Sequence, residues 1–210
     1  MMEKKMSELI SRSFNDYQIR KEENEERAHI TGTPIVFEQA TDIGGYFKEI
    51  ISRGAISNDV LKDVAFFYNH DLNTKPLART RTGKLKFEVT DEGVKMDADV
   101  NLKRNDVNDL YLSIEDGDID GMSFMFRVEE EEWKDLDTEY PTRRINKIGY
   151  VQEVSAVNYP AYEGTEIYAR ANSSLDNELN ALDSARAKAM DIAKRNEEIN
   201  IIKEMLRKEK

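Results

Sequence analysis

Cysteine is absent from the 210-residue chain, which excludes disulfide bonds, thiolate nucleophiles and cysteine-ligated metal centres. Histidine is scarce. Only His29 and His70 occur, and two distant histidines without an H-E-x-x-H spacing offer little from which to build a zinc site. The chain has no apolar run of membrane-spanning length and none typical of a signal peptide, so we expect a soluble protein without a membrane partner.

Positive charge is in the minority. The net charge is −11 and the pI is about 4.9, which argues against a nucleic-acid partner, because phosphate contacts need clustered Lys and Arg. Apolar residues still make up 39% of the chain, enough for one domain with a sizeable core. Residues 116–121 repeat the first half of a calcium loop, D-x-D-x-D-G, but Arg127 stands where that loop needs Glu. We expect neither a metal ion nor another cofactor.

Residues 173–210 differ from the rest of the chain. They contain no Gly, Pro or aromatic residue and carry as many basic as acidic side chains, so the whole negative net charge lies in residues 1–172. This composition predicts one long helix, which is either a coiled-coil or partner-binding helix or a solvated one. We therefore divide the chain into a flexible N-terminal segment (1–26), a folded domain (27–172) and a helical tail (173–210).

The folded domain has a mainly β pattern. Residues 85–89 and 94–100 predict a hairpin, and residues 104–115 predict a helix with its apolar residues on one face. The fold class is therefore mainly β with helices (α+β), a sheet or barrel with one or two helices packed against it. Further strands are expected at residues 29–37, 64–68, 122–128, 145–157 and 166–169.

Two of three candidate catalytic side chains stand in or beside apolar strands. His70 follows the apolar run 64–68 where a polar segment begins, a position that suits a base held by a sheet and reachable from solvent. A histidine there could equally close a strand with a backbone hydrogen bond. Ser123, between Met122 and Phe124, is either a buried serine of the sheet or a nucleophile shielded from water.

The third candidate, Glu153, interrupts an apolar strand. By strand alternation it should share a face with Val151 and Ser155, where a carboxylate is costly unless it is paired or hydrogen-bonded. Orienting a histidine would satisfy this carboxylate. An ion pair with Arg143 or Arg144 would satisfy it as well.

Four segments, taken together and in order, resemble the prohead (capsid maturation) serine proteases of tailed phages of the HK97 type. They are IGGYFKEIISRGAI at residues 43–56, NHD and KPLAR within residues 69–79, DGMSFMF at residues 120–126 and EVSAVNYPAY at residues 153–162. The resemblance extends over residues 28–170. The chain departs from the family pattern at Met125, where a small residue is usual, and at Ala78, where glycine is usual.

The resemblance implies a serine endopeptidase with a β-barrel similar to that of the herpesvirus assemblins. Carried over by motif, Ser123 would be the nucleophile, His70 the general base and acid, and Glu153 the orienting carboxylate. It also implies the partners, which are the major capsid protein with its scaffold or N-terminal delta segment, and the protease itself. The setting would be the procapsid in the host bacterial cytoplasm, and a homo-oligomer is compatible with it.

No motif identifies the oxyanion donors, and backbone amides near Arg143 and Arg144 or after Val157 are the candidates. Two other functions fit the residues. One is a non-enzymatic capsid assembly or scaffolding protein that uses the helical tail. The other is a β domain that binds a basic partner through its acidic surface.

Overall fold

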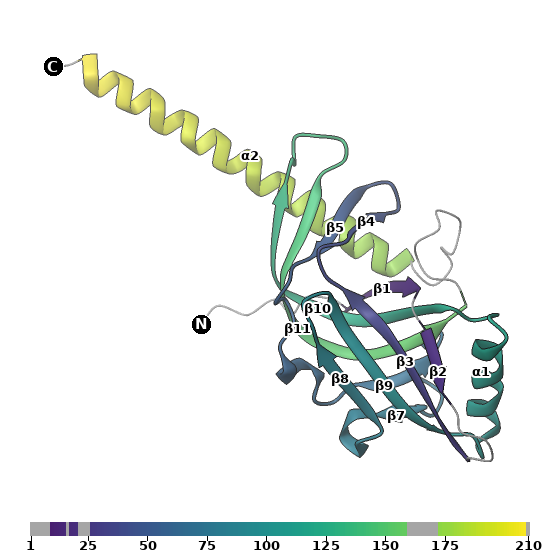
Figure 1. Ribbon diagram of the computed structural model, residues 1–210. Coiled ribbons are helices and arrows are strands. Elements are labelled where there is room, and N and C mark those ends of the chain that lie inside the picture. Colours follow the sequence, from purple (N-terminus) through teal and green to yellow (C-terminus); the bar gives the residue numbers. More distant parts are fainter. Residues whose placement is uncertain (1–8, 16, 21–25, 159–171, 209–210) are drawn as a thin grey trace.

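The computed structural model describes residues 9–15, 17–20, 26–158 and 172–208, and Figure 1 shows two β-sheets, a short helix and one long helix. The helices are α1 (Asn105–Glu115) and α2 (Asn172–Lys208), with two 3₁₀ turns, η1 (Asn58–Leu61) and η2 (Thr80–Thr82). The strands are β1 (Leu9–Asn15), β2 (Tyr17–Arg20), β3 (Arg27–Val36), β4 (Ala40–Ile43), β5 (Phe47–Ile51), β6 (Ala65–Tyr68), β7 (Ala78–Arg79), β8 (Leu85–Val89), β9 (Gly93–Asn101), β10 (Gly121–Lys134) and β11 (Thr142–Val157).

The larger sheet has the strand order β1-β10-β11-β5-β4, and β11 is long enough to pair with two further strands on one side. The first part of β11 pairs in parallel with β5, and residues 153–156 pair in parallel with β6. The smaller sheet is antiparallel, in the order β2-β3-β9-β8. The larger sheet therefore places β6, β11 and β10 side by side.

One hydrophobic core lies between the two sheets and α1. Buried and less buried residues alternate along β3 and β9, as expected for a sheet with one face on the core. In the larger sheet, Phe124 and Phe126 of β10 stack with 4.6 Å between ring centroids, and Phe66 of β6 joins the same cluster. Each such side chain contributes about 1.5–3 kcal/mol on burial. The core therefore fixes which residues of β10 and β11 lie on the opposite face.

Two predicted elements are confirmed. The helix expected at residues 104–115 is α1, and the residues expected on its inner face are its buried ones. The expected hairpin is formed by β8 and β9. At the start of β9, a Cβ on Gly93 would lie 2.1 Å from the carbonyl oxygen of Ile35, so only glycine fits this close strand contact.

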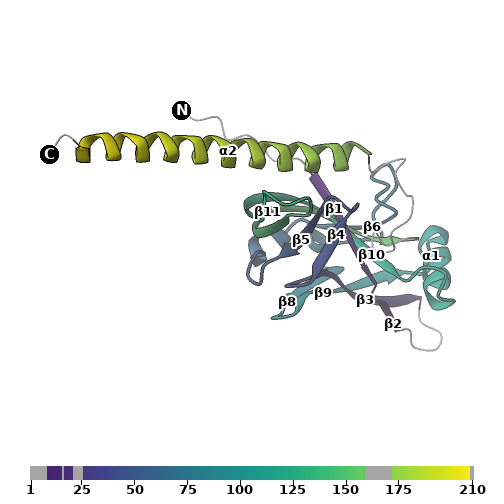
Figure 2. The same cartoon turned by 90° about the horizontal axis from the view of Figure 1, so that it is seen from above.

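The long C-terminal helix is confirmed as α2, whose 37 residues extend roughly 55 Å at about 1.5 Å per residue. Its first half is anchored to the larger sheet. Leu182 packs with Phe47 in a second, smaller apolar cluster, and Arg186 donates hydrogen bonds to two carbonyls of the β10–β11 connection. From Met190 on, every side chain that the structure describes is exposed, and both views show the helix projecting away from the sheets (Figures 1 and 2).

The mainly β fold with helices is confirmed, but the expected barrel is not closed, because no ladder among the described strands joins the edges of the two sheets. Two strands, β1 and β2, lie within residues 1–26, where the sequence pattern indicated none, and β4 and β5 were not expected either. The strand expected at residues 166–169 falls outside the described residues. Neither of the two described helices is both long and apolar enough to cross a membrane.

Candidate active site

His70 lies in a tight turn that follows β6 and folds back over β11. Asn69 and His70 both have a left-handed backbone, with φ of 49° and 56°, a conformation that Asn and His adopt more readily than most residues. The Asn69 amide donates to the carbonyl of Ala156 in β11 at 2.8 Å. The turn directs the imidazole toward β11, where its Nδ1 lies 2.7 Å from Oε1 of Glu153.

A second set of hydrogen bonds holds the same turn against the end of β11. Oδ1 of Asn69 accepts from the backbone amide of Asn158 at 3.1 Å, and the Tyr68 hydroxyl donates to the Asn158 side chain. Left-handed backbone at residues other than glycine costs about 1–3 kcal/mol each and persists only where surrounding contacts determine it. These contacts provide that support, so β11 sets the position of His70.

Glu153 is fully buried, and a β-bulge directs its side chain away from the core. Phe126 pairs with Val151 whereas Met125 pairs with Glu153, so β11 accommodates one extra residue, Gln152. Bulges re-aim side chains and are common beside active sites. The expectation that Glu153 and Val151 share a face was therefore wrong. Val151 packs into the hydrophobic core, and Glu153 lies on the other face of the larger sheet.

Ser155 completes the hydrogen bonding of this pair, a role that sequence analysis did not assign to it. Its hydroxyl donates to Oε2 of Glu153 and accepts a 3.2 Å hydrogen bond from the backbone amide of His70. Both oxygens of the buried carboxylate are thus engaged, one by the imidazole and one by the hydroxyl. The available signal was the spacing, because residues two apart on a strand share a face.

Ser123 lies on β10 directly opposite Ser155 in the antiparallel ladder. Directly opposed residues share a face and have Cβ atoms about 4.5–5.5 Å apart. Ser123, Ser155 and Glu153 are all 0% exposed, whereas the His70 side chain is 24% exposed. On its other side, β10 pairs with β1, whose Ser13 stands opposite Ser123. Ser123 and Glu153 thus lie on adjacent strands of one sheet, and His70 lies in the turn that follows β6, the next strand of that sheet.

Arg143 and Arg144 do not pair with Glu153. Arg143 is buried and donates to Glu49 at 3.1 Å, and Arg144 donates to Glu38 at 2.9 Å. Both arginines lie near the beginning of β11, roughly 30 Å from the site at about 3.3 Å per residue. Their amides are therefore too distant to be the oxyanion donors that sequence analysis considered. The segment after β11, the other candidate, begins at Asn158 and continues outside the described residues.

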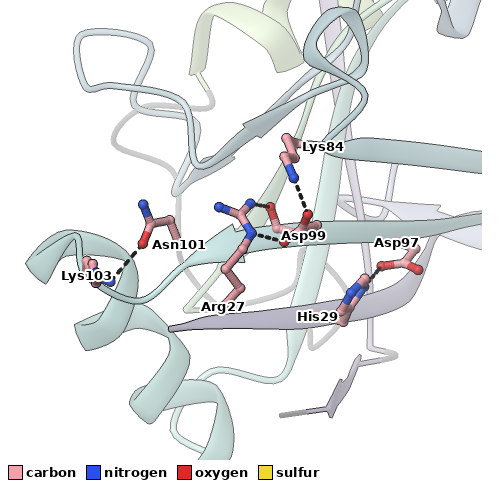
Figure 3. A network of polar contacts seen from close by, with 7 residues as sticks. All are labelled: Arg27, His29, Lys84, Asp97, Asp99, Asn101 and Lys103. Carbon is pink, nitrogen blue, oxygen red and sulfur yellow. Dashed lines mark hydrogen bonds and ion pairs between the residues drawn. The ribbon is translucent and has the colours of Figure 1, made fainter. Parts of the chain in front are cut away.

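His29, the other histidine, lies in a separate polar network on the smaller sheet (Figure 3). Its Nδ1 is 2.6 Å from Oδ1 of Asp97 on the neighbouring strand. Asp99 accepts hydrogen bonds from Arg27 at 2.5 Å and from Lys84 at 2.6 Å. Burial raises the pKa of Asp99 and these hydrogen bonds lower it, and the net result lies below the usual value. The network joins β3 and β9 of the smaller sheet and is separate from the site.

The segment that copies half a calcium loop ends the helix α1. Gly117 has a left-handed φ of 80°, and the Ile119 amide donates to the carbonyl of Ser113 at 3.1 Å. A left-handed glycine after the last turn is a common way to end a helix. Over the described part of the chain, no three His, Asp or Glu side chains are grouped as metal ligands.

A sequence model of the caudovirus prohead serine protease family matches residues 15–179, which include His70, Ser123 and Glu153. No curated protein and no solved structure matches the chain. Because the family match covers most of the chain, the resemblance of the four segments is confirmed. The chain belongs to the caudovirus prohead serine proteases and is a serine peptidase of phage capsid maturation.

Proposed function

We propose that Ser123 is the nucleophile, His70 the general base and acid, and Glu153 the carboxylate that orients the imidazole. The observation that carries this assignment is the 2.7 Å hydrogen bond between His70 Nδ1 and the fully buried Glu153. A carboxylate that accepts from Nδ1 keeps the proton on that nitrogen, so Nε2 takes the proton of a serine hydroxyl. The position of Ser123 opposite Ser155, which itself binds Glu153, supports the choice of serine.

The reaction follows from these roles. Ser123 Oγ attacks the carbonyl carbon of the scissile peptide while its proton passes to Nε2 of His70. The C–N bond then breaks, His70 protonates the departing amine, and an acyl ester remains on Ser123. Water, deprotonated by the same imidazole, hydrolyses the ester and restores the hydroxyl. General acid–base assistance contributes about 10²–10⁴-fold, so oxyanion donors must contribute a comparable share.

Ser155 is a positioning residue in this scheme. It binds the second oxygen of Glu153 and the backbone amide of His70, so both partners of the pair are held relative to β11. As the imidazolium forms, Glu153 stabilises its positive charge. This stabilisation exceeds that available in water, because the carboxylate and its serine neighbours are buried.

The substrates we propose are the scaffold or N-terminal delta segment of the major capsid protein, and the protease chain itself. Prohead proteases act inside the procapsid, and family membership implies contact with capsid proteins. The net charge of −11 favours substrate segments rich in Lys and Arg, because opposite charges increase the rate of encounter.

Co-expression with the cognate major capsid protein tests the proposal. We expect the wild type to shorten the capsid protein, and Ser123→Ala or His70→Ala to leave it at full length, as measured by mass spectrometry. Ser113→Ala on α1 is the matched control, because the Ser113 hydroxyl donates to the Asp109 carbonyl of its own helix, and this variant should trim like the wild type. Full trimming by Ser123→Ala would remove Ser123 from the mechanism. No trimming by folded wild type would favour the non-enzymatic assembly role.

A further inference from the structure

The second half of α2 carries exposed apolar side chains that the described part of the chain does not cover. Both views show this half of the helix extending away from the sheets (Figures 1 and 2). Large apolar side chains repeated along a projecting helix favour an interaction with a partner. Their exposed fractions are 72% for Met190, 60% for Ile192, 41% for Ile199, 53% for Ile201, 56% for Ile202 and 62% for Met205.

We propose that one face of this half-helix binds an acidic amphipathic helix of another protein. Ile192 and Ile199 are seven residues apart and Ile202 is three residues further, a spacing that aligns them on one side of a helix. We call this side the basic–apolar face. It consists of Ile192, Ile199 and Ile202 together with Lys188, Arg195 and Lys203.

The charges on the basic–apolar face are mostly positive. Lys188 precedes Ile192 by one turn, Arg195 follows it by one turn, and Lys203 lies one turn beyond Ile199. Two acidic side chains lie along one edge of this face: Asp191, one turn from Lys188 and Arg195, and Glu198, one turn from Arg195 and Ile202. Cations therefore flank Ile192 and Ile199 on both sides, and three cations against two acidic side chains leave this face with a net positive charge.

The opposite face of the same half-helix has a mixed charge. Ile201 and Met205 line it one turn apart, and Glu197, Glu204 and Lys194 lie beside them. Since residues 173–210 carry as many acidic as basic side chains, the excess of positive charge on one face is matched by acidic residues elsewhere on the helix. Charge therefore distinguishes two faces that are similar in apolar content.

The positive charge of the basic–apolar face indicates which kind of partner binds there. Two copies of this chain that met through the basic–apolar face would oppose their cations, and like charges across an interface lower affinity. A partner helix with Glu or Asp beside an apolar stripe would instead pair with all three cations while covering the isoleucines. Residues 1–172 carry the whole net charge of −11, so such a partner is repelled by the domain and attracted to the projecting half of α2.

This docking surface goes beyond the proposed proteolysis. None of its residues belongs to the site around His70, and the site lies on strands whereas the surface lies on the projecting helix. Binding and cleavage can therefore fail independently. A variant that loses the docking interaction should still cut a short peptide substrate.

A binding assay with a designed probe tests the inference. The full chain carries Ser123→Ala to prevent cleavage of the probe, a fluorescein-labelled peptide of about four heptads with Leu in core positions and Glu in flanking positions. A matched peptide has Lys in place of every Glu. Fluorescence anisotropy is measured at about 50 mM and about 500 mM NaCl. We expect the acidic peptide to bind at least about tenfold more tightly than the basic one, and the difference to shrink in high salt.

Substitutions then locate the contact. Ile199→Asp with Ile202→Asp should weaken binding about tenfold or more, because charge replaces the apolar contact. Ile201→Asp with Met205→Asp, the matched change on the opposite face, should leave affinity within about twofold. Reversing the three cations to Glu should reverse the preference between the two peptides. Circular dichroism of each variant checks that α2 remains helical.

Other occupants give different results. Equal binding of the two peptides, or equal losses in the two aspartate variants, would overturn the proposal. Preferential binding of vesicles of phosphatidylcholine and phosphatidylglycerol would assign the face to an anionic membrane surface and contradict a protein helix. Concentration-dependent dimers in sedimentation velocity that disappear with Ile199→Asp would assign it to a second copy of the chain, which also contradicts the proposal.

Discussion

The ring of His70 is hydrogen-bonded to a carboxylate, that of Glu153, which has no contact with solvent. The ring itself is 24% exposed, so the pair has one partly exposed partner and one buried partner. A buried carboxylate cannot gain stabilisation from water and depends on the groups that bind it. The histidine and the hydroxyl of Ser155 fill that role, and each of these contacts can be tested separately.

Glu153→Gln should lower kcat by about 10²–10⁴-fold with little change in KM. The amide of glutamine can donate to Nδ1 and so favour the tautomer with its proton on the wrong nitrogen. Steady-state kinetics on a peptide that contains the mapped cleavage site provide the measurement. Glu130→Gln, at the exposed end of β10, is the control and should behave like the wild type. An unchanged kcat for Glu153→Gln would exclude the orienting role.

Ser155→Ala should lower kcat while leaving Ser123 and His70 in place. The change removes a donor to Glu153 and an acceptor for the His70 amide, and each loss in a buried setting costs about 1–3 kcal/mol. Nuclear magnetic resonance of the Nδ1 proton of His70 separates positioning from general destabilisation. Its resonance should shift or broaden in Ser155→Ala at a temperature where the variant is fully folded. An unaltered resonance together with reduced kcat would contradict the positioning role.

Arg143→Met should destabilise the fold by about 3–5 kcal/mol, because it leaves the buried Glu49 without the charge of its cation. The side chains of Arg143 and Glu49 are 4% and 1% exposed. The double variant Arg143→Met with Glu49→Gln should recover part of the loss, since no buried anion then faces the methionine. Urea unfolding of the wild type and the two variants gives the free energies. Equal stability of wild type and Arg143→Met would show that this pair is not structural.

Gly93→Ala should destabilise the fold by more than about 1–3 kcal/mol, the usual cost of overpacking. The new Cβ would lie 2.1 Å from the backbone oxygen of Ile35, and backbone cannot move aside as a flexible side chain can. Gly149→Ala is the matched control, because its Cβ would meet the side chain of Glu129 at 3.1 Å. Thermal unfolding should therefore show a much larger drop in Tm for Gly93→Ala. Similar drops for both would contradict the tight contact.

Acid should destabilise the protein through carboxyls in ion pairs. The hydrogen bond from Arg104 lowers the pKa of Asp106, the backbone amide of Arg53 lowers that of Glu38, and the pKa of Asp99 is lowered too. A carboxyl with a lower pKa in the folded state stabilises fully above its unfolded pKa, about 3.9–4.3, and this stability is lost as the pH falls through the folded value. Tm should therefore fall below about pH 4. Asp99→Asn should reduce the accompanying loss of unfolding free energy by less than about 1 kcal/mol. A Tm independent of pH in this range would contradict the ion pairs.

Local sequence patterns predicted the elements whose apolar residues repeat regularly. In α1 and in the β8–β9 hairpin, the spacing of the apolar residues shows which face packs against the core. These elements can therefore be recognised without knowing what they pack against. In β5, Glu49 occupies a buried position and hides the alternation, because its charge is satisfied by Arg143 on another strand. The pairing of β1 depends on the open edge of β10, which no pattern within β1 encodes.

The site could be predicted in part for similar reasons. Motif resemblance indicated His70, Ser123 and Glu153, and the structure places their strands side by side. The bulge at Gln152 was not predictable, because a bulge is a property of the register between two strands and not of either sequence. The same bulge turns Glu153 toward the histidine. The direction of the Glu153 side chain therefore could not be predicted from the sequence and is known only from the fold.

Ser123 has no exposed surface, and β1 closes the edge of its strand. A hydroxyl that is inaccessible to water is also inaccessible to a polypeptide substrate. We therefore expect the newly made enzyme to be latent. It should leave neighbouring proteins uncleaved until the packing around β10 loosens. The resting conformation itself would then set when cleavage begins, and no separate inhibitor would be required.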